Sequence, residues 1–378
     1  MPRSFTPARA LLFEERIESA LAALLSSLKD AAADAWTGAA LGGALARGEG
    51  FTPARPEDPL GATDPLEIAA VVDVPLRELA GVDRRLSRAL ERTARSRRVE
   101  ANVRALARAS LPLLPATVEN LELLAAARVV DGPPDLLAPA RTADEAPGAM
   151  EALRLLVRSG GRLLAAEMAL EKHPGSRAAE RALLAVETAD LSCGAAVLVS
   201  ARRFAPSEEA RGDALRALGA GGDDAPRGFQ TKMTWTRFHD LVEAHRAALR
   251  SRLHAAEVPP LGELRQRLAR AADRWLEVLR LSEEERLGRE LGSWSAHARA
   301  LASRVARSAA LFGADEDALP TRREVKRWTA AERGAPALGA LLDWDPHDLP
   351  VAPVLLDLPD DAPKETLRAR AAALAAEA

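Results

Sequence analysis

The chain has a single cysteine, no tyrosine and, at 3% of its 378 residues, very few aromatic side chains. Because Cys193 has no second cysteine to pair with, an intrachain disulfide is excluded, and so is a zinc site built on several thiolates. Lysine, isoleucine and asparagine are also scarce, since the sequence holds five, two and two of them against 47 arginines. These scarce residues share AT-rich codons, so a GC-rich bacterial genome explains both their depletion and the excess of arginine.

The N-terminal region lacks the apolar core of a signal peptide. Glu14, Glu15 and Glu18 fall where that core would have to run without charges. The longest uncharged stretch nearby, residues 35–46, has 12 residues and is mostly alanine and glycine. A membrane-spanning helix needs roughly 20 strongly apolar residues, so this stretch does not qualify. We expect a cytoplasmic protein with no membrane association.

The sequence is rich in alanine, leucine and arginine. Hydrophobic residues make up 48% and charged residues 28%, a composition typical of globular proteins. Alanine and leucine are the strongest apolar helix formers, whereas the β-branched and aromatic residues that favour strands are scarce. We therefore predict an all-α fold of multi-helix bundles, divided into two helical domains, with no sheet of more than two strands.

Proline and glycine divide the chain into four parts. Four prolines make a continuous helix impossible across residues 131–147, which we interpret as a linker. The predicted domains are an N-terminal helical domain at residues 1–130 and a C-terminal helical bundle at residues 148–342. An acidic, proline-rich tail with a short terminal helix is expected at residues 343–378.

The first domain is expected to hold two long helical regions. One runs from about Ala8 to Asp30, with a continuation to Ala46 left open, and the other spans residues 76–110. Within the second region, residues 83–108 hold nine arginines against three acidic residues.

At 3.6 residues per turn, five of these arginines fall on one stripe of the helix, opposite an apolar face. The arginine stripe consists of Arg84, Arg88, Arg92, Arg95 and Arg98, and the apolar face consists of Leu79, Val82, Leu86 and Leu90. The next apolar residues are out of phase with this face, so we expect the helix to break near residues 93–96 or to contact different partners with its two halves. A solvated stripe is the simplest interpretation, and the alternatives are binding to phosphate groups or to an acidic protein segment.

The second domain is expected to open with an antiparallel pair of helices at residues 149–172 and 176–204. The later helix is apolar almost all round, which is typical of a helix buried by several neighbours. Its only charges in the apolar part are Glu187 and Asp190, and we expect them to form a narrow exposed seam because unpaired charges seldom stay buried. A buried pair with raised pKa values would instead be a candidate functional site.

Turn and capping signals complete the second half of the chain. Residues 219–228, rich in glycine, are predicted to be a flexible break. Residues 351–358 have a strand-like composition, but Pro353 disfavours a strand there. Two capping boxes mark helix starts: Ser282 with Glu285, and Thr321 with Glu324.

Motifs for phosphate, zinc and hydrolase chemistry are missing, since GxxxxGK[ST], HExxH and GxSxG do not occur. His239 and Glu243, four residues apart on one helix face, are more typical of a surface contact than of a metal site. Asp343, Asp345 and Asp348 resemble the opening of a calcium loop, but the glycine and the distal glutamate of such a loop are missing. We therefore predict no cofactor and no metal.

Two classes of function remain open. The missing motifs and the segregated charges favour an interaction or scaffold protein that binds a protein partner, including copies of itself, with nucleic-acid binding at the arginine stripe a weaker alternative. The second class is an all-helical enzyme or ligand-binding protein with a pocket between helices, lined by groups such as Glu187, Asp190, His239 and His245. A large polar pocket favours the second class, and a flat apolar patch favours the first.

Two oppositely charged segments suggest a contact. Residues 343–361 contain six aspartates and neither lysine nor arginine; this acidic segment carries Asp343, Asp345, Asp348, Asp357, Asp360 and Asp361. We expect the acidic segment to cover the arginine stripe, within one chain or across a dimer, and so to keep nucleic acid away from it. Exposed ion pairs are weak, so this contact would be sensitive to salt.

Overall fold

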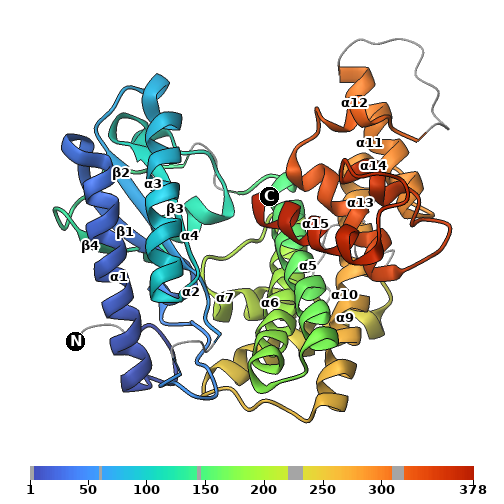
Figure 1. Cartoon of the computed structure of the whole chain (residues 1–378), viewed down its shortest axis with the longest axis horizontal. Coiled ribbons are helices and arrows are strands. Elements are labelled where there is room, and N and C mark those ends of the chain that lie inside the picture. The colour runs from blue at the N-terminus through green and yellow to red at the C-terminus, as the bar shows by residue number, and fades with distance from the viewer. Residues whose placement is uncertain (1–3, 59–61, 143–145, 220–232, 309–318) are drawn as a thin grey trace. The chain divides into compact units, whose positions relative to one another are not determined.

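The structure is a computed structural model that describes residues 4–58, 62–142, 146–219, 233–308 and 319–378 (Figure 1). Helices make up 65% of it and strands 8%, so the predicted helical majority is confirmed. The chain forms two compact units. Unit 1 comprises Met1–Pro147, Ala205–Arg211 and Leu249–Val258, and unit 2 comprises Gly148–Phe204, Gly212–Ala248 and Pro259–Ala378.

Unit 1 is built on a mixed four-stranded sheet in the order β3-β2-β1-β4. The strands are β1 (Trp36–Gly42), β2 (Leu66–Val72), β3 (Ala101–Ala107) and β4 (Arg128–Asp131). β2 and β3 run parallel, whereas β1 is antiparallel to both of its neighbours. The expectation of no sheet beyond two strands is therefore wrong. β1 is rich in alanine and glycine, but most of it is buried in the centre of the sheet, where pairing and packing override helix propensity.

Helices and loops cover both faces of this sheet. Leu41 and Ile68 point to the face that packs against α1 (Leu11–Ala32) and α3 (Leu76–Arg97). Ala40 and Val71 lie an odd number of residues from Leu41 and Ile68 on the same strands, so they point to the other face. There they pack with η2 (Arg108–Leu113), α4 (Val118–Ala126) and residues 136–140. Two short elements complete the unit, η1 (Ala33–Ala35) and α2 (Gly43–Arg47).

Of the two long helices of unit 1, α1 agrees with the predicted span within three residues at each end, whereas α3 is shorter than predicted. α1 ends at Ala32, and the open continuation to Ala46 is instead η1, β1 and part of α2. α3 ends at Arg97, because Arg98 takes a left-handed conformation with φ 57° and the chain turns into β3. The predicted break thus falls just after residues 93–96. Because α3 ends there, the apolar residues that are out of phase with its buried face follow the helix, in β3 and in the turn before it, and are not part of it.

The predicted linker, residues 131–147, packs within unit 1 as far as it is described. Leu136 and Ala140 are buried in the core of the second sheet face. Thr142 pairs in an isolated bridge with Leu114. The prolines of this segment therefore end regular structure without freeing the chain from the domain.

Buried ion pairs hold the segments Ala205–Arg211 and Leu249–Val258 in unit 1. Arg211, 3% exposed, pairs with Glu122 on α4, and Arg47 on α2 binds the same carboxylate at 2.7 Å. Although burial raises the pKa of Glu122, these two guanidinium groups hold it below its usual value. Arg252, 4% exposed, donates to Asp64 at 3.0 Å. Charges removed from water need such partners, so residues far apart in sequence fix the fold together.

Unit 2 contains the predicted antiparallel pair, α5 (Ala149–Lys172) and α6 (Ser176–Ser200). The remaining helices are α7 (Glu208–Gly219), α9 (Trp235–Arg252), α10 (Leu261–Leu287), α11 (Trp294–Ser308), α12 (Arg322–Val325), α13 (Ala330–Asp343), α14 (Val351–Leu355) and α15 (Lys364–Glu377). α10 packs against both helices of the pair, and α13 and α15 pack against α5. α7 and α9 each contribute residues to both units.

α6 is a core helix of unit 2. By length and composition it is apolar enough to cross a membrane, but 89% of its most apolar window is buried inside the protein, as in core helices of many soluble proteins. Glu187 and Asp190 are 3% and 5% exposed. The expected exposed seam is therefore wrong, because both carboxylates lie on a helix that other helices surround.

The capping signals were partly right. The box of Thr321 with Glu324 opens α12 as predicted, but Ser282 lies buried inside α10 and starts no helix. A further box, Thr329 with Glu332, opens α13. Residues 351–355 are helical, in keeping with the argument from Pro353 against a strand. The predicted break at residues 219–228 lies outside the described residues except for its first residue.

Candidate ligand pocket

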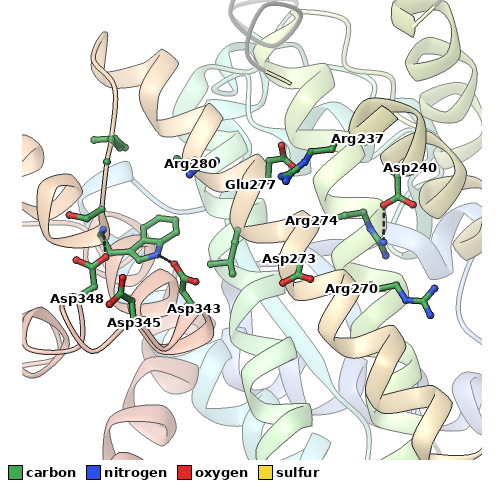
Figure 2. Close-up of a pocket in the computed structure, with 15 residues that line it drawn as sticks. Arg237, Asp240, Arg270, Asp273, Arg274, Glu277, Arg280, Asp343, Asp345 and Asp348 are labelled. Carbon is green, nitrogen blue, oxygen red and sulfur yellow. Dashed lines mark hydrogen bonds and ion pairs between the residues drawn. The ribbon is translucent and has the colours of Figure 1, made fainter. Parts of the chain in front are cut away.

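A pocket of about 490 Å³ lies in unit 2. Its walls come from α9, α10, the residues that lead into α11, and the residues that follow α13. Ten of its fifteen lining residues are charged, four arginines and six acids. Figure 2 shows Asp343, Asp345 and Asp348 on one side of the pocket and Arg270 and Asp240 on the other.

One face of α10 forms a wall of the pocket. Each of Arg270, Asp273, Arg274, Glu277 and Arg280 lies three or four residues from another member of the set, and all five line the pocket. Residues at such spacings share one side of a helix. α10 therefore presents charges of both signs along about 15 Å of its length, at 1.5 Å per residue.

The opposite side of α10 is fixed by Trp275. This indole is fully buried, and its Nε1 donates to the backbone oxygen of Leu156 on α5 at 2.7 Å. A Cβ atom at Gly160 would lie 2.3 Å from the same ring, so only glycine lets the indole pack this closely. The contact sets how far α10 stands from α5, and with it the position of the pocket wall.

Arg274 joins the pocket to the core of unit 2. Its Nη2 donates to both carboxylate oxygens of Asp190 on α6, at 2.9 and 3.1 Å, and its Nη1 donates to Asp240 on α9 at 3.2 Å. Burial raises the pKa of Asp190 to about 6, although Arg274 opposes the shift; nearby Asp240 adds to it. The guanidinium is thus shared between a buried carboxylate and an exposed one.

The other charges of the pocket differ in whether they are paired. Arg237 on α9 forms an ion pair with Glu277 at 3.0 Å. The side chains of Arg270, Asp273 and Arg280 are exposed, and none has an ion pair or a hydrogen bond to any residue that the structure describes. The pocket therefore combines neutralised pairs with charges of both signs that remain available to a ligand.

Trp294 builds the acidic side of the pocket. Its indole packs on α13 at Gly339, where a Cβ atom would lie 2.3 Å from the ring. Its Nε1 donates to Oδ2 of Asp343 at 3.0 Å, which orients that carboxylate. Asp345 accepts a hydrogen bond from the backbone of His347 through Oδ1. Each of the two aspartates keeps one carboxylate oxygen without a hydrogen bond from a described residue.

Asp348, on the same acidic side of the pocket, stabilises the start of α11. It accepts hydrogen bonds from the backbone amides of Trp294 at 2.7 Å and Ser295 at 3.0 Å, and so caps the N-terminus of α11. Although burial raises the pKa of Asp348, these amides lower it below its usual value. Both oxygens of Asp348 are committed to the helix, so Asp343 and Asp345 are the aspartates that face a ligand.

A second buried polar cluster of unit 2 lies outside the pocket lining. Glu283 on α10 accepts two hydrogen bonds from Arg286, at 2.6 and 2.5 Å, and one from His297 on α11 at 2.7 Å. Burial raises the pKa of Glu283, but the hydrogen bonds and charges of these partners hold it at about 2. The cluster joins α10 to α11, and the Trp294 ring lies 6.1 Å from that of His297.

The predicted arginine stripe is no part of this pocket. Four of its arginines, Arg84, Arg88, Arg92 and Arg95, are exposed on α3 in unit 1, and Arg98 is exposed just after the helix ends. The opposite residues Val82, Leu86 and Leu90 are buried. Arg95 pairs with the exposed Glu91, one turn earlier, at 2.8 Å. Four of the five arginines therefore share one exposed face of α3, and what the stripe binds stays a prediction.

The acidic segment contributes to the pocket only with its first three aspartates. Asp357 and Asp360 instead pair within unit 2, with Lys326 at 3.3 Å and Arg322 at 2.6 Å. Asp361 is exposed. Asp357 and Asp360 are thus already paired with basic residues of unit 2. The expected contact between the acidic segment and the arginine stripe stays a prediction.

None of the four residues predicted to line an inter-helix pocket lines this one, although Asp190 is bound by the lining residue Arg274. His239 is exposed, and His245 is buried where α9 meets Gly194 of α6. The arginines of α10 and Trp294 were missed. The charged periodicity of α10 was visible in the sequence, but a solvated helix face carries the same pattern.

Among the described residues, no group of three or more histidine, cysteine, aspartate or glutamate side chains is arranged to hold a metal ion. Comparisons with known protein families, with curated proteins and with solved structures find no match for this chain.

Proposed function

We propose that unit 2 binds a small polar ligand in the pocket between α9, α10 and residues 343–348. The observation that carries this proposal is that Arg270, Asp273 and Arg280 have no partner among the described residues, whereas the adjacent Arg274 and Glu277 are paired. The volume of about 490 Å³ is typical of ligand sites, which span roughly 300–1,000 Å³. A ligand with charged or hydrogen-bonding groups would compensate these charges, whereas an apolar ligand would leave them desolvated.

Filling the pocket tests the proposal. Gly292 lines the pocket and has open space around its Cα, so Gly292→Phe places a large side chain there without strain. A thermal-shift screen of amino acids, peptides, amines and carboxylates should find ligands that stabilise the natural chain and not Gly292→Phe.

The matched control for this experiment is Gly262→Phe. Gly262 also has open space around it, but it lies in the first turn of α10 and outside the pocket lining. This variant should respond to ligands as the natural chain does. A screen in which no compound stabilises the natural chain, or in which both variants respond alike, would show that the pocket is not a binding site.

A second candidate function is docking of an acidic protein segment, including one from another copy of this chain, on the arginine stripe. Four exposed arginines on one face of α3, with the exposed Arg98 just after the helix, support it, since such a surface attracts polyanions. Binding of an acidic peptide that weakens steeply with salt, and that is lost when Arg84, Arg88 and Arg92 become glutamine, is the expected result. Stronger binding of a DNA duplex than of the peptide would favour nucleic acid instead.

A further inference from the structure

We propose that the open edge of β3 binds an acidic, extended segment of a partner protein, which adds a strand to the sheet of unit 1 beside the arginines of α3. β3 lies at one end of the sheet, and among the described strands it pairs only with β2. This inference deepens the second candidate function, docking of an acidic segment on the arginine stripe, and rests on it.

The backbone groups of β3 that point away from β2 belong to every second residue. In a parallel pair, successive residues turn their amide and carbonyl toward the partner strand and away from it in alternation. Leu66 on β2 donates to the carbonyl oxygen of Glu100, which fixes the phase of this alternation. Ala101 and Val103 therefore turn their amides and carbonyls outward, and no hydrogen bond links these groups to any residue that the structure describes.

The edge is open only along the first half of β3. The amide of Ala105 also points outward, but it donates to Oδ1 of Asp83 on α3 at 2.8 Å. The carbonyl oxygen of Ala107 accepts a hydrogen bond from Ser110 at 2.7 Å, and Ala107 is fully buried. Charged side chains at an edge strand limit uncontrolled pairing, so β3 accepts a short segment rather than the edge of a whole sheet.

Asp83 also shows which side of α3 lies beside the open edge. Its carboxylate reaches the outward amide of Ala105, so its side of the helix faces the edge. Arg84, the next residue, lies 100° further round the helix, toward solvent, and Arg88 repeats its position one turn later. These two arginines of the stripe therefore lie beside a strand that pairs with β3.

The charge along this edge favours an acidic partner. Arg98 is exposed three residues before Ala101 and adds a positive charge at the start of β3. Glu91, the acidic residue on this face of α3, is paired with Arg95 at 2.8 Å. A strand with acidic side chains on the side that faces α3 gains ion pairs as well as backbone hydrogen bonds. Pairing between the β3 edges of two copies would instead bring their arginines together, which is unfavourable.

N-methylated peptides test strand addition on the natural chain. The probe is a fluorescein-labelled Glu-Thr-Glu-Thr-Glu-Thr-Glu peptide, whose glutamates share one side of a strand. Only alternate amides of a bound strand point to β3, so N-methylation at its third and fifth positions should differ in effect from N-methylation at its fourth and sixth. By fluorescence anisotropy at low salt, one of these changes should weaken binding about tenfold or more, and the other by less than about threefold.

Variants of the chain locate the peptide on the edge. Val103→Pro removes an outward amide that the pairing with β2 does not use, a replacement that edge strands accept, and it should weaken binding about tenfold. Val103→Ala loses side-chain packing but keeps the amide, so it is the control. Arg84→Gln with Arg88→Gln should weaken binding and reduce its salt dependence. Arg55→Gln with Arg141→Gln, two exposed arginines elsewhere in unit 1, should do neither.

The outcomes separate strand addition from docking by charge alone. If the two N-methylated peptides bind alike, or if Val103→Pro binds as tightly as Val103→Ala, strand addition is wrong, and docking on the arginine stripe stands. If the peptide does not bind, or if a DNA duplex binds more tightly and is insensitive to Val103→Pro, the docking of acidic segments is wrong as well. The proposed function of the pocket in unit 2 is independent of these results.

Discussion

Arg274 on α10 donates three hydrogen bonds to Asp190 on α6, across 84 residues of sequence, and a fourth to Asp240 on α9. One guanidinium thus connects three helices of unit 2 at the floor of the pocket. Because Asp190 is buried, its charge depends on this contact, and the stability of the unit should respond to proton uptake there.

The pKa of Asp190 predicts a pH dependence of stability. It is raised from the usual 3.8 to about 6, so the folded chain binds more protons than the unfolded chain between these values. The stabilisation is complete below the unfolded pKa and is lost as the pH rises through about 6. From pH 5 to pH 7, urea denaturation should show the natural chain losing about 1 kcal/mol relative to Asp190→Asn. Parallel stability curves for the two proteins would contradict the raised pKa.

Gly160 should tolerate no side chain. Its Cα faces the Trp275 ring so closely that Gly160→Ala must displace α10 or α5, at a cost of about 1–3 kcal/mol in the free energy of unfolding. Gly262→Ala, where the added Cβ meets open space, should instead be neutral or gain about 0.5–1 kcal/mol from helix propensity. Thermal or urea unfolding checks both, and equal effects of the two replacements would argue against the close contact.

Glu283 is expected to hold its cluster together by charge. Glu283→Gln leaves the buried Arg286 without a countercharge and weakens the contact to His297, so we expect a loss of about 3 kcal/mol in stability. Glu285→Gln, an exposed neighbour on the same helix, should change stability by about 0.5 kcal/mol or less. A small effect at residue 283 would mean that the cluster is more hydrated than its burial indicates.

The pair of Arg252 with Asp64 should secure residues 249–258 to unit 1. Asp64→Asn removes the charge that compensates a buried guanidinium, and hydrogen exchange of backbone amides in this segment should become faster. The exposed Glu57→Gln serves as the control and should leave exchange unchanged. Unchanged exchange in Asp64→Asn would show that apolar packing alone fixes the segment.

The sequence revealed the helical half of the fold better than the sheet. The predicted helical pair at residues 149–172 and 176–204 matches α5 and α6 closely, because each helix carries its own apolar pattern. β1 was missed because Ala39 and Ala40 favour helix locally and become strand only through pairing with β2 and β4. β2, with Ile68 and Val71, carried the clearest strand signal in the chain.

The pocket was predictable only in part. Asp343 and Asp345 were singled out by their spacing, although as a calcium-like opening rather than as a pocket wall. The partner of Arg274 is 84 residues away, and no local pattern assigns such a contact. Burial of Asp190 was likewise misjudged, because the rule that charges avoid the core does not say which arginine from another helix will satisfy them.

The central claim, that a ligand binds beside Trp294, is tested most directly by the indole N–H resonances of the six tryptophans in ¹⁵N-labelled protein. Trp294 donates to Asp343 at the pocket, whereas Trp275 donates to Leu156 in the core. Titration with the strongest ligand from the thermal screen should shift the Trp294 resonance in a saturable way, with the same affinity as calorimetry, and leave Trp275 unmoved. A ligand that saturates the protein without shifting Trp294 would contradict binding in this pocket.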